Sequence, residues 1–258
     1  MLALLFGLFG LVIGSFLNVV ILRRGARSIG GRSSCMQCGH RLAVADLIPV
    51  VSYLFVRGRC RYCGSRISAQ YPLVEAATAA LFFLIGASPL PLSLQLLALP
   101  ILALLICIAV YDARHTIIPD EWVYTFAALG LLFGSLYSGA FGLTILAGVG
   151  AASPLALLWL LSYGRWMGLG DSKLSLGIGF LLGPWGAYLA LTSAFVLGAA
   201  FFLPLVIRAR FTPTALSRGG SAGLTMKSEV PLGPFLILAC IIVWFLQLYG
   251  APILSLWQ

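Results

Sequence analysis

Apolar residues are gathered along this chain into long runs separated by short polar stretches. A helix needs roughly 17–25 mainly apolar residues to cross the hydrocarbon core of a bilayer. Runs of this kind are expected to form helices at residues 2–22, 72–88, 92–111, 121–138, 141–163, 172–186, 187–207 and 231–250. Gly183 and Pro184 mark the turn between the sixth run and the seventh. The pattern predicts an all-α, polytopic membrane helix bundle with about eight transmembrane helices.

The composition agrees with a membrane protein. Hydrophobic residues make up 61% of the chain and charged residues only 9%, whereas soluble domains carry about 25% charged residues. The run at residues 2–22 lacks a basic n-region and a small-residue cleavage site, so we expect a retained helix rather than a signal peptide.

The basic residues indicate an orientation. Nine of the 16 lie between residues 23 and 70, and in the eight-helix arrangement the others fall on the same side of the membrane. The positive-inside rule then places residues 23–70 in the cytoplasm and both termini outside it. Attraction to anionic membrane lipid accounts for the positive charge, so no nucleic acid partner is expected.

The expected organisation has four parts. Residues 1–22 form the first transmembrane helix, 23–70 a cytoplasmic loop domain, 71–250 a seven-helix membrane catalytic core, and 251–258 a short extracytoplasmic tail.

The loop domain contains two C-x-x-C pairs, each followed by glycine: Cys35 with Cys38, and Cys60 with Cys63. The pairs are 21 residues apart, a spacing that resembles a zinc ribbon, and four thiolates suit tetrahedral zinc. Bound metal would let a loop rich in arginine fold. A reducing cytoplasm disfavours disulfides, while redox-active or metal-free cysteines remain alternatives.

His40, next to the first cysteine pair, and the two remaining cysteines of the chain have simpler explanations. His40 is expected at the surface, because four cysteines already complete a zinc site. Cys107 and Cys240 lie within apolar runs and are expected to be small packing residues.

Two aspartates are the candidate catalytic groups. Asp112 ends an apolar run, where the helix dipole disfavours a negative charge, and Asp171 begins another, where the dipole favours it. Gly168 and Gly170 precede Asp171 and leave room for a second backbone to approach. Two carboxylates that share one proton are what an aspartic protease needs, but the spacing alone does not show that these two meet.

Three further charged residues are, like Gly168 and Gly170, candidates for substrate-binding or supporting roles. Asp120 follows Pro119 and precedes a helix, as an N-cap does. Glu75 is expected in the first turn of a helix, where it interacts with the dipole or pairs with a loop arginine. Lys173 is expected to pair with Asp171 or to mark the membrane surface. The sequence contains no H-E-x-x-H motif or P-loop and no serine–histidine–aspartate arrangement.

Six motifs in order resemble those of the type IV prepilin peptidases, a family of bacterial inner-membrane aspartic peptidases. Besides the cysteine pairs they are "GSFLNVVILR" at 14–23, "QYPLVEAATAALF" at 70–82, "DARHTIIPD" at 112–120, "GLGDSKL" at 168–174 and "VPLGPFL" at 230–236. In the last motif Leu232 replaces the family's phenylalanine.

This resemblance implies that Asp112 and Asp171 are catalytic. It also implies cleavage of type IV prepilin and pseudopilin leaders after a glycine, at the cytoplasmic face. Many members of the family then methylate the new N-terminus with S-adenosylmethionine, for which the residues themselves indicate no site.

Other functions fit parts of the pattern. Tyr111-Asp112 and the G-x-G-D sequence ending at Asp171 match a presenilin-like intramembrane protease, although its P-A-L motif is absent and the cysteine loop is foreign to it. A transporter would use buried carboxylates to couple ions, and an adapter would bind partners through the cysteine loop.

Overall fold

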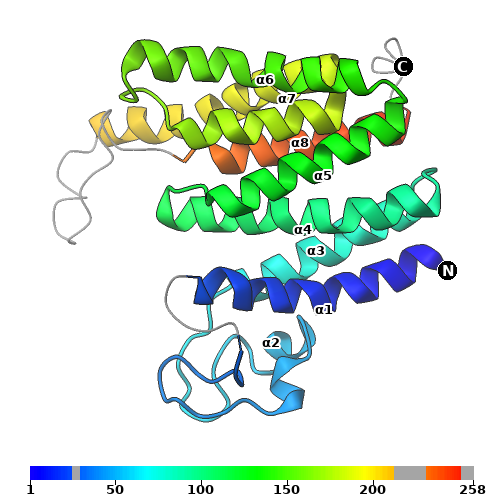
Figure 1. Ribbon diagram of the computed structural model, residues 1–258. Coiled ribbons are helices and arrows are strands. Elements are labelled where there is room, and N and C mark those ends of the chain that lie inside the picture. The colour runs from blue at the N-terminus through cyan, green and yellow to red at the C-terminus, as the bar shows by residue number, and fades with distance from the viewer. Residues whose placement is uncertain (25–29, 212–230, 251–258) are drawn as a thin grey trace. The chain divides into compact units, whose positions relative to one another are not determined.

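The computed structural model describes residues 1–24, 30–211 and 231–250 of the 258-residue chain (Figure 1). The expected tail at 251–258, and the loop residue Arg27, lie outside this part. The described residues form helices and loops, with two isolated β-bridges and no strand. The prediction of an all-α helix bundle is confirmed.

The helices follow the predicted apolar runs closely. They are α1 (Leu2–Arg23), α2 (Val51–Phe55), α3 (Gln70–Ala87), α4 (Leu92–His115), α5 (Asp120–Ser138), α6 (Phe141–Ser162), α7 (Leu169–Phe211) and α8 (Gly233–Leu248), with a short 3-10 helix, η1 (Val44–Leu47). Gly183 interrupts α7 with φ 72° and ψ −179°. If α7 is counted as two helices at this point, the long helices correspond one by one to the eight predicted runs.

Among the described residues, five helices are long and apolar enough to cross a membrane: α1, α3, α4, α6 and the Leu169–Pro204 part of α7. The apolar helix α8 is shorter, with 16 residues. Asp120 and Glu121 in the first turn of α5 lower its hydropathy. The chain is therefore a multi-pass membrane protein.

The chain divides into two compact units, Met1–Cys107 and Ile108–Gln258. In the first unit, α1 packs on α3 through glycine. A Cβ atom at Gly10 would lie 2.8 Å from the Ala79 Cα, and one at Gly14 would lie 2.7 Å from the Glu75 Cα. Small residues let membrane helices approach this closely.

The second unit is built around α7, which packs on α5, α6 and α8 (Figure 1). Glycines again allow the contacts. A Cβ atom at Gly134 of α5 would overlap the Phe180 carbonyl oxygen, and one at Gly148 of α6 would overlap the Phe180 ring. These contacts fix α7 at Phe180, and the first turn of the same helix carries Asp171.

Candidate active site and metal site

Asp112 lies in the last turn of α4 and is buried, with 4% of its surface exposed. Its Oδ2 atom has no hydrogen-bond partner among the described residues. The carboxylate faces Gly233, the first residue of α8, whose backbone N–H is within interacting distance. The sequence indicates only the unfavourable dipole of α4. The structure adds the N-terminus of α8, which favours a negative charge at the same carboxylate.

Asp171 lies in the first turn of α7, as predicted, and is close enough to Asp112 for the two carboxylates to interact electrostatically. The structure therefore brings together the two aspartates whose proximity the spacing left open. Both belong to the second unit. Chemically, two neighbouring carboxyl groups in a poorly solvated place can divide the tasks of proton acceptor and proton donor.

Ile118, in the loop between α4 and α5, packs beside Gly170, which precedes Asp171, and beside Gly233, which lies against Asp112. A Cβ atom at Gly170 would lie 3.1 Å from the Ile118 Cβ, and one at Gly233 would lie 3.5 Å from the Ile118 Cδ1. Neither Ile118 nor Gly233 is a candidate in the sequence analysis. The Gly-Pro pair at 233–234, at the start of an apolar run, is the signal that indicates a helix N-terminus there.

Gly170→Ala is expected to lower the melting temperature more than it lowers kcat, because the added methyl group must displace Ile118 by a few tenths of an ångström. Gly168→Ala is the matched variant, since a Cβ atom there has only the Gly170 nitrogen within 4 Å, at 3.9 Å. Thermal melting of both proteins, with kcat per folded enzyme, makes the comparison. A Gly170→Ala enzyme with normal melting and strongly reduced kcat would show instead that Gly170 shapes the reacting geometry.

Lys173 pairs with Asp120 and not with Asp171, because its Nζ donates to the Asp120 Oδ1 at 2.7 Å. The same ammonium group lies 5.4 Å from the centre of the Tyr124 ring. The N-cap expected at Asp120 is wrong: Pro119 is the capping residue, and Asp120 is the first residue of α5 with no side-chain cap bond. The ion pair instead joins the first residue of α5 to the fifth residue of α7.

The position predicted for Glu75 is also wrong, because α3 begins at Gln70 and its first turn holds no acidic residue. Glu75 lies further along α3 and is buried, with 7% of its surface exposed. Its Oε2 accepts the backbone N–H of Val50 at 2.7 Å. Val50 precedes α2 with φ 59°, an unfavourable conformation for a β-branched residue. A membrane helix thus holds a strained turn of the loop domain.

Glu75→Ala is expected to destabilise the loop domain by about 1–3 kcal/mol, because the Val50 N–H loses its acceptor. Glu75→Gln keeps an acceptor oxygen and is expected to cost less. Thermal melting and the rate of proteolysis near Val50 measure both effects. Equal behaviour of the two variants would contradict a role for this hydrogen bond.

The four loop cysteines meet, with their Sγ atoms all within 4.8 Å of one another. The Sγ atoms of Cys35 and Cys63 are 3.9 Å apart, and tetrahedral zinc with Zn–S bonds of about 2.3 Å requires sulfur atoms roughly 3.8 Å apart. The cluster therefore has the donor set and the spacing to hold a metal ion.

The two C-x-x-C pairs fold in the same way. The N–H of Gly39 donates to the Cys35 carbonyl, and the N–H of Gly64 donates to the Cys60 carbonyl, both at 2.9 Å. Both glycines have positive φ, 70° and 71°, a conformation that glycine adopts without steric cost. The sequence thus places glycine where each turn needs it.

Hydrogen bonds to the sulfurs prepare the cluster for a cation. Backbone N–H groups of Cys38 and Gln37 lower the pKa of the Cys35 thiol to about 6. The hydroxyl and the backbone N–H of Ser65 lower the pKa of Cys63. Thiolates are the metal ligands, so both effects favour metal binding. The pKa of the Cys38 thiol is raised to about 11, by desolvation and by the neighbouring Cys35 and Cys63 sulfurs, so this ligand loses its proton only when a cation binds.

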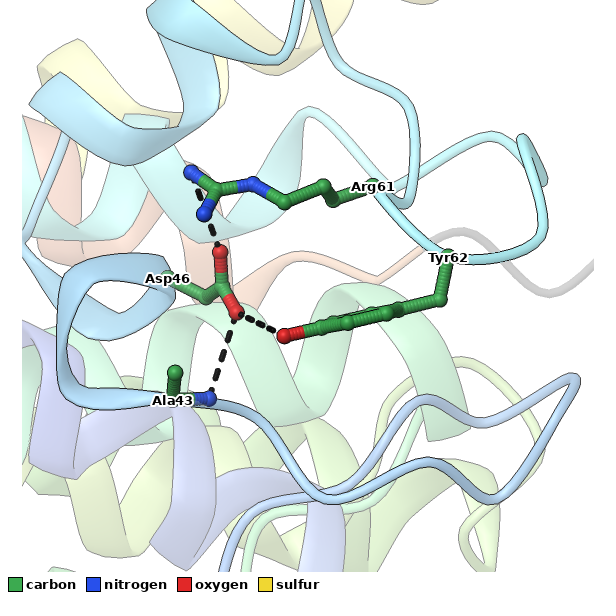
Figure 2. A network of polar contacts seen from close by, with 4 residues as sticks. All are labelled: Ala43, Asp46, Arg61 and Tyr62. Atoms are coloured by element: carbon green, nitrogen blue, oxygen red, sulfur yellow. Dashed lines mark hydrogen bonds and ion pairs between the residues drawn. The ribbon is translucent and has the colours of Figure 1, made fainter.

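A polar network connects η1 with the second cysteine pair (Figure 2). Asp46 Oδ2 accepts the Tyr62 hydroxyl at 3.1 Å and the Ala43 N–H at 3.2 Å. Asp46 Oδ1 lies 3.4 Å from an Arg61 nitrogen. His40 is exposed, as expected, and its ring centre lies 3.7 Å from that of Tyr62. Cys107 and Cys240 are buried within helices and are not members of the cluster.

The cavity between α6 and the second half of α7, of about 290 Å³, does not fit S-adenosylmethionine. Tyr188 is the only one of its nine lining residues with a polar side-chain atom. A zwitterionic methyl donor requires charged or amide partners, which this cavity does not offer.

The fold and the paired carboxylates define a class: a helical, multi-pass membrane protein with two interacting aspartates at helix ends. Comparison with known families then identifies it. Residues 8–88 match the bacterial peptidase A24 N-terminal domain, and residues 99–203 match the type IV leader peptidase family. The chain belongs to the type IV leader peptidase family, as the motifs imply. Together with the long apolar helices, this membership indicates a multi-pass protein of the inner membrane.

Curated relatives match over nearly the whole chain, and those named here are called prepilin leader peptidase/N-methyltransferase. The Dichelobacter nodosus protein is 35% identical over 96% of this chain and 91% of its own length. The Bacillus subtilis (strain 168) protein is 35% identical over 99% of this chain and 97% of its own length. The Pseudomonas putida protein is 33% identical over 95% of this chain and 89% of its own length. No solved structure gives a significant match.

Proposed function

We propose that this protein is an aspartic endopeptidase that removes the leader peptides of type IV prepilins and pseudopilins. The observation that carries the proposal is the electrostatic interaction of Asp112 with Asp171, two carboxylates from different helices, of which Asp112 is buried and Asp171 is partly buried. Membership of the type IV leader peptidase family supports it.

The reaction needs no other side chain for its proton transfers. One ionised carboxylate of the pair takes a proton from a water molecule, which attacks the scissile carbonyl carbon. The neutral carboxylic acid donates its proton to the carbonyl oxygen. When the tetrahedral intermediate collapses, the C–N bond breaks and the leaving amine receives a proton from the pair. The ion pair of Lys173 with Asp120 holds the N-terminal ends of α5 and α7 together and thereby supports Asp171.

The reaction takes place at the cytoplasmic face in this proposal. The support is the gathering of basic residues in the loop at 23–70, which also puts both termini outside the cytoplasm. A prepilin's basic leader then stays in the cytoplasm and its apolar helix in the bilayer. The scissile bond between them reaches the height of the two aspartates.

Two further features belong to the proposal. The four-cysteine cluster binds zinc, which stabilises the loop domain and takes no part in hydrolysis. After cleavage, the new N-terminus is methylated with S-adenosylmethionine. This second activity is supported by the names of the relatives alone.

The test is to mix the purified full chain with a synthetic prepilin leader peptide, with and without S-adenosylmethionine, and to weigh the products. Cleavage after the glycine gives two fragments, and methylation adds about 14 Da to one of them only when the methyl donor is present. An intact peptide would overturn the proposal. Cleavage of unrelated transmembrane helices instead would favour the presenilin-like alternative.

A further inference from the structure

The first turn of α8 leaves one backbone donor directed away from its own helix. The N–H groups of Phe235 and Leu236 both donate to the Leu232 carbonyl, at 3.0 and 3.1 Å. Pro234 has no N–H group. Among the first four residues of α8, the N–H of Gly233 is therefore the donor that remains, at the positive end of the helix dipole.

The buried carboxylate of Asp112 lies against this residue. Its Oδ2 is inaccessible and has no hydrogen-bond partner among the described residues. A Cβ atom at Gly233 would overlap that oxygen and would lie 3.1 Å from the Asp112 Cγ. Only glycine leaves enough room at this position for the carboxylate to reach the start of the helix.

We propose that Gly233 is a positioning residue for Asp112. Because Gly233 has no side chain, the Asp112 carboxylate packs against the N-terminus of α8, and this contact fixes the direction of the carboxylate toward Asp171. The inference rests on the proposed function, in which Asp112 is catalytic. Ile118 supports this arrangement from the other side, since it lies against Gly233 and against Gly170, in the turn that carries Asp171.

Gly233→Ala tests the inference in the purified full chain with the leader peptide as substrate. The methyl group displaces the Asp112 carboxylate, so kcat is expected to fall on the order of 100-fold, because small misplacements of reacting groups are costly. KM is expected to stay nearly unchanged. The pH–rate profile is expected to shift, since the N–H no longer acts on the carboxylate charge. A packing defect would lower the whole profile without moving it.

Gly198→Ala is the matched control. A Cβ atom there would meet Leu232 and Phe235, in the same turn of α8, at an ordinary 3.9 Å. It is expected to change neither kcat nor the pH–rate profile.

Pro234→Ala keeps the inference testable if Gly233→Ala fails to fold. It adds an N–H group to the turn and no atom at residue 233, and it is expected to shift the pH–rate profile in the opposite sense to Gly233→Ala. An unchanged profile in Pro234→Ala, or a folded Gly233→Ala enzyme with normal kcat, would overturn the inference.

The failure of this inference differs from that of the proposed function. If Asp112→Asn is inactive and Gly233→Ala is fully active, only the role of Gly233 is wrong. If Asp112→Asn remains active, the catalytic pair itself is wrong.

Discussion

Asp112→Asn and Asp171→Asn are each expected to reduce cleavage of a prepilin leader peptide to near background, a loss of about 10²–10⁴-fold. An amide has nearly the shape of a carboxylate but neither takes nor gives the proton that the reaction moves. Because the two carboxylates have different tasks, neither replaces the other, and the double variant is expected to be little worse than either single one.

Glu121→Gln provides the control, since it makes the same chemical change at an exposed carboxylate in the first turn of α5. Asp120→Asn is expected to lower the cleavage rate far less than the catalytic variants do. Asp120 remains largely exposed in its ion pair with Lys173, and exposed ion pairs contribute at most about 1 kcal/mol. Initial rates, with thermal melting to show that each variant is folded, give the answer. Substantial activity in folded Asp112→Asn would disprove the pair.

The second large effect concerns metal. The purified full chain is expected to contain about one zinc ion per chain, and Cys38→Ser is expected to lose it, because structural zinc sites require all four ligands. Loss of the ion is expected to unfold the loop domain, since metal binding supplies much of the folding free energy of such small units. Elemental analysis and limited proteolysis of the loop measure the two effects.

Cys107→Ala is the control, because Cys107 is buried in α4 and is not part of the cluster. It is expected to keep its zinc. Peptidase activity in Cys38→Ser is expected to fall less than the metal content, since both aspartates lie outside the loop. Wild-type protein without zinc, or with a disulfide in freshly lysed cells, would contradict the prediction.

The apolar runs predict the helices well because a bilayer leaves few alternatives for a long apolar segment. Even the interruption at Gly183 follows from the Gly-Pro pair. The cysteine cluster is predictable for a similar reason: each C-x-x-C-G segment makes its turn locally, through hydrogen bonds within a few residues.

Pairings between distant segments are not predictable in this way. Asp120 has the local sequence pattern of an N-cap, but its carboxylate accepts a hydrogen bond from Lys173, more than 50 residues away. Glu75 accepts an N–H from a loop 25 residues earlier in the chain. Gly233 serves Asp112 across a still longer separation, so no spacing rule reveals it. In each case the partner is set by tertiary packing and not by local sequence.

The break at Gly183 also has a consequence for the surrounding lipid. The part of α7 before it, residues 169–182, is about 21 Å long at 1.5 Å per residue, whereas a typical hydrocarbon core is about 30 Å thick. Local thinning of the bilayer is one of the ways in which a hydrophobic mismatch of this size is relieved. Asp171 begins this short segment, so a thinned membrane would bring headgroups and water down toward it. The length of the lipid acyl chains is then expected to affect how readily water reaches the paired carboxylates.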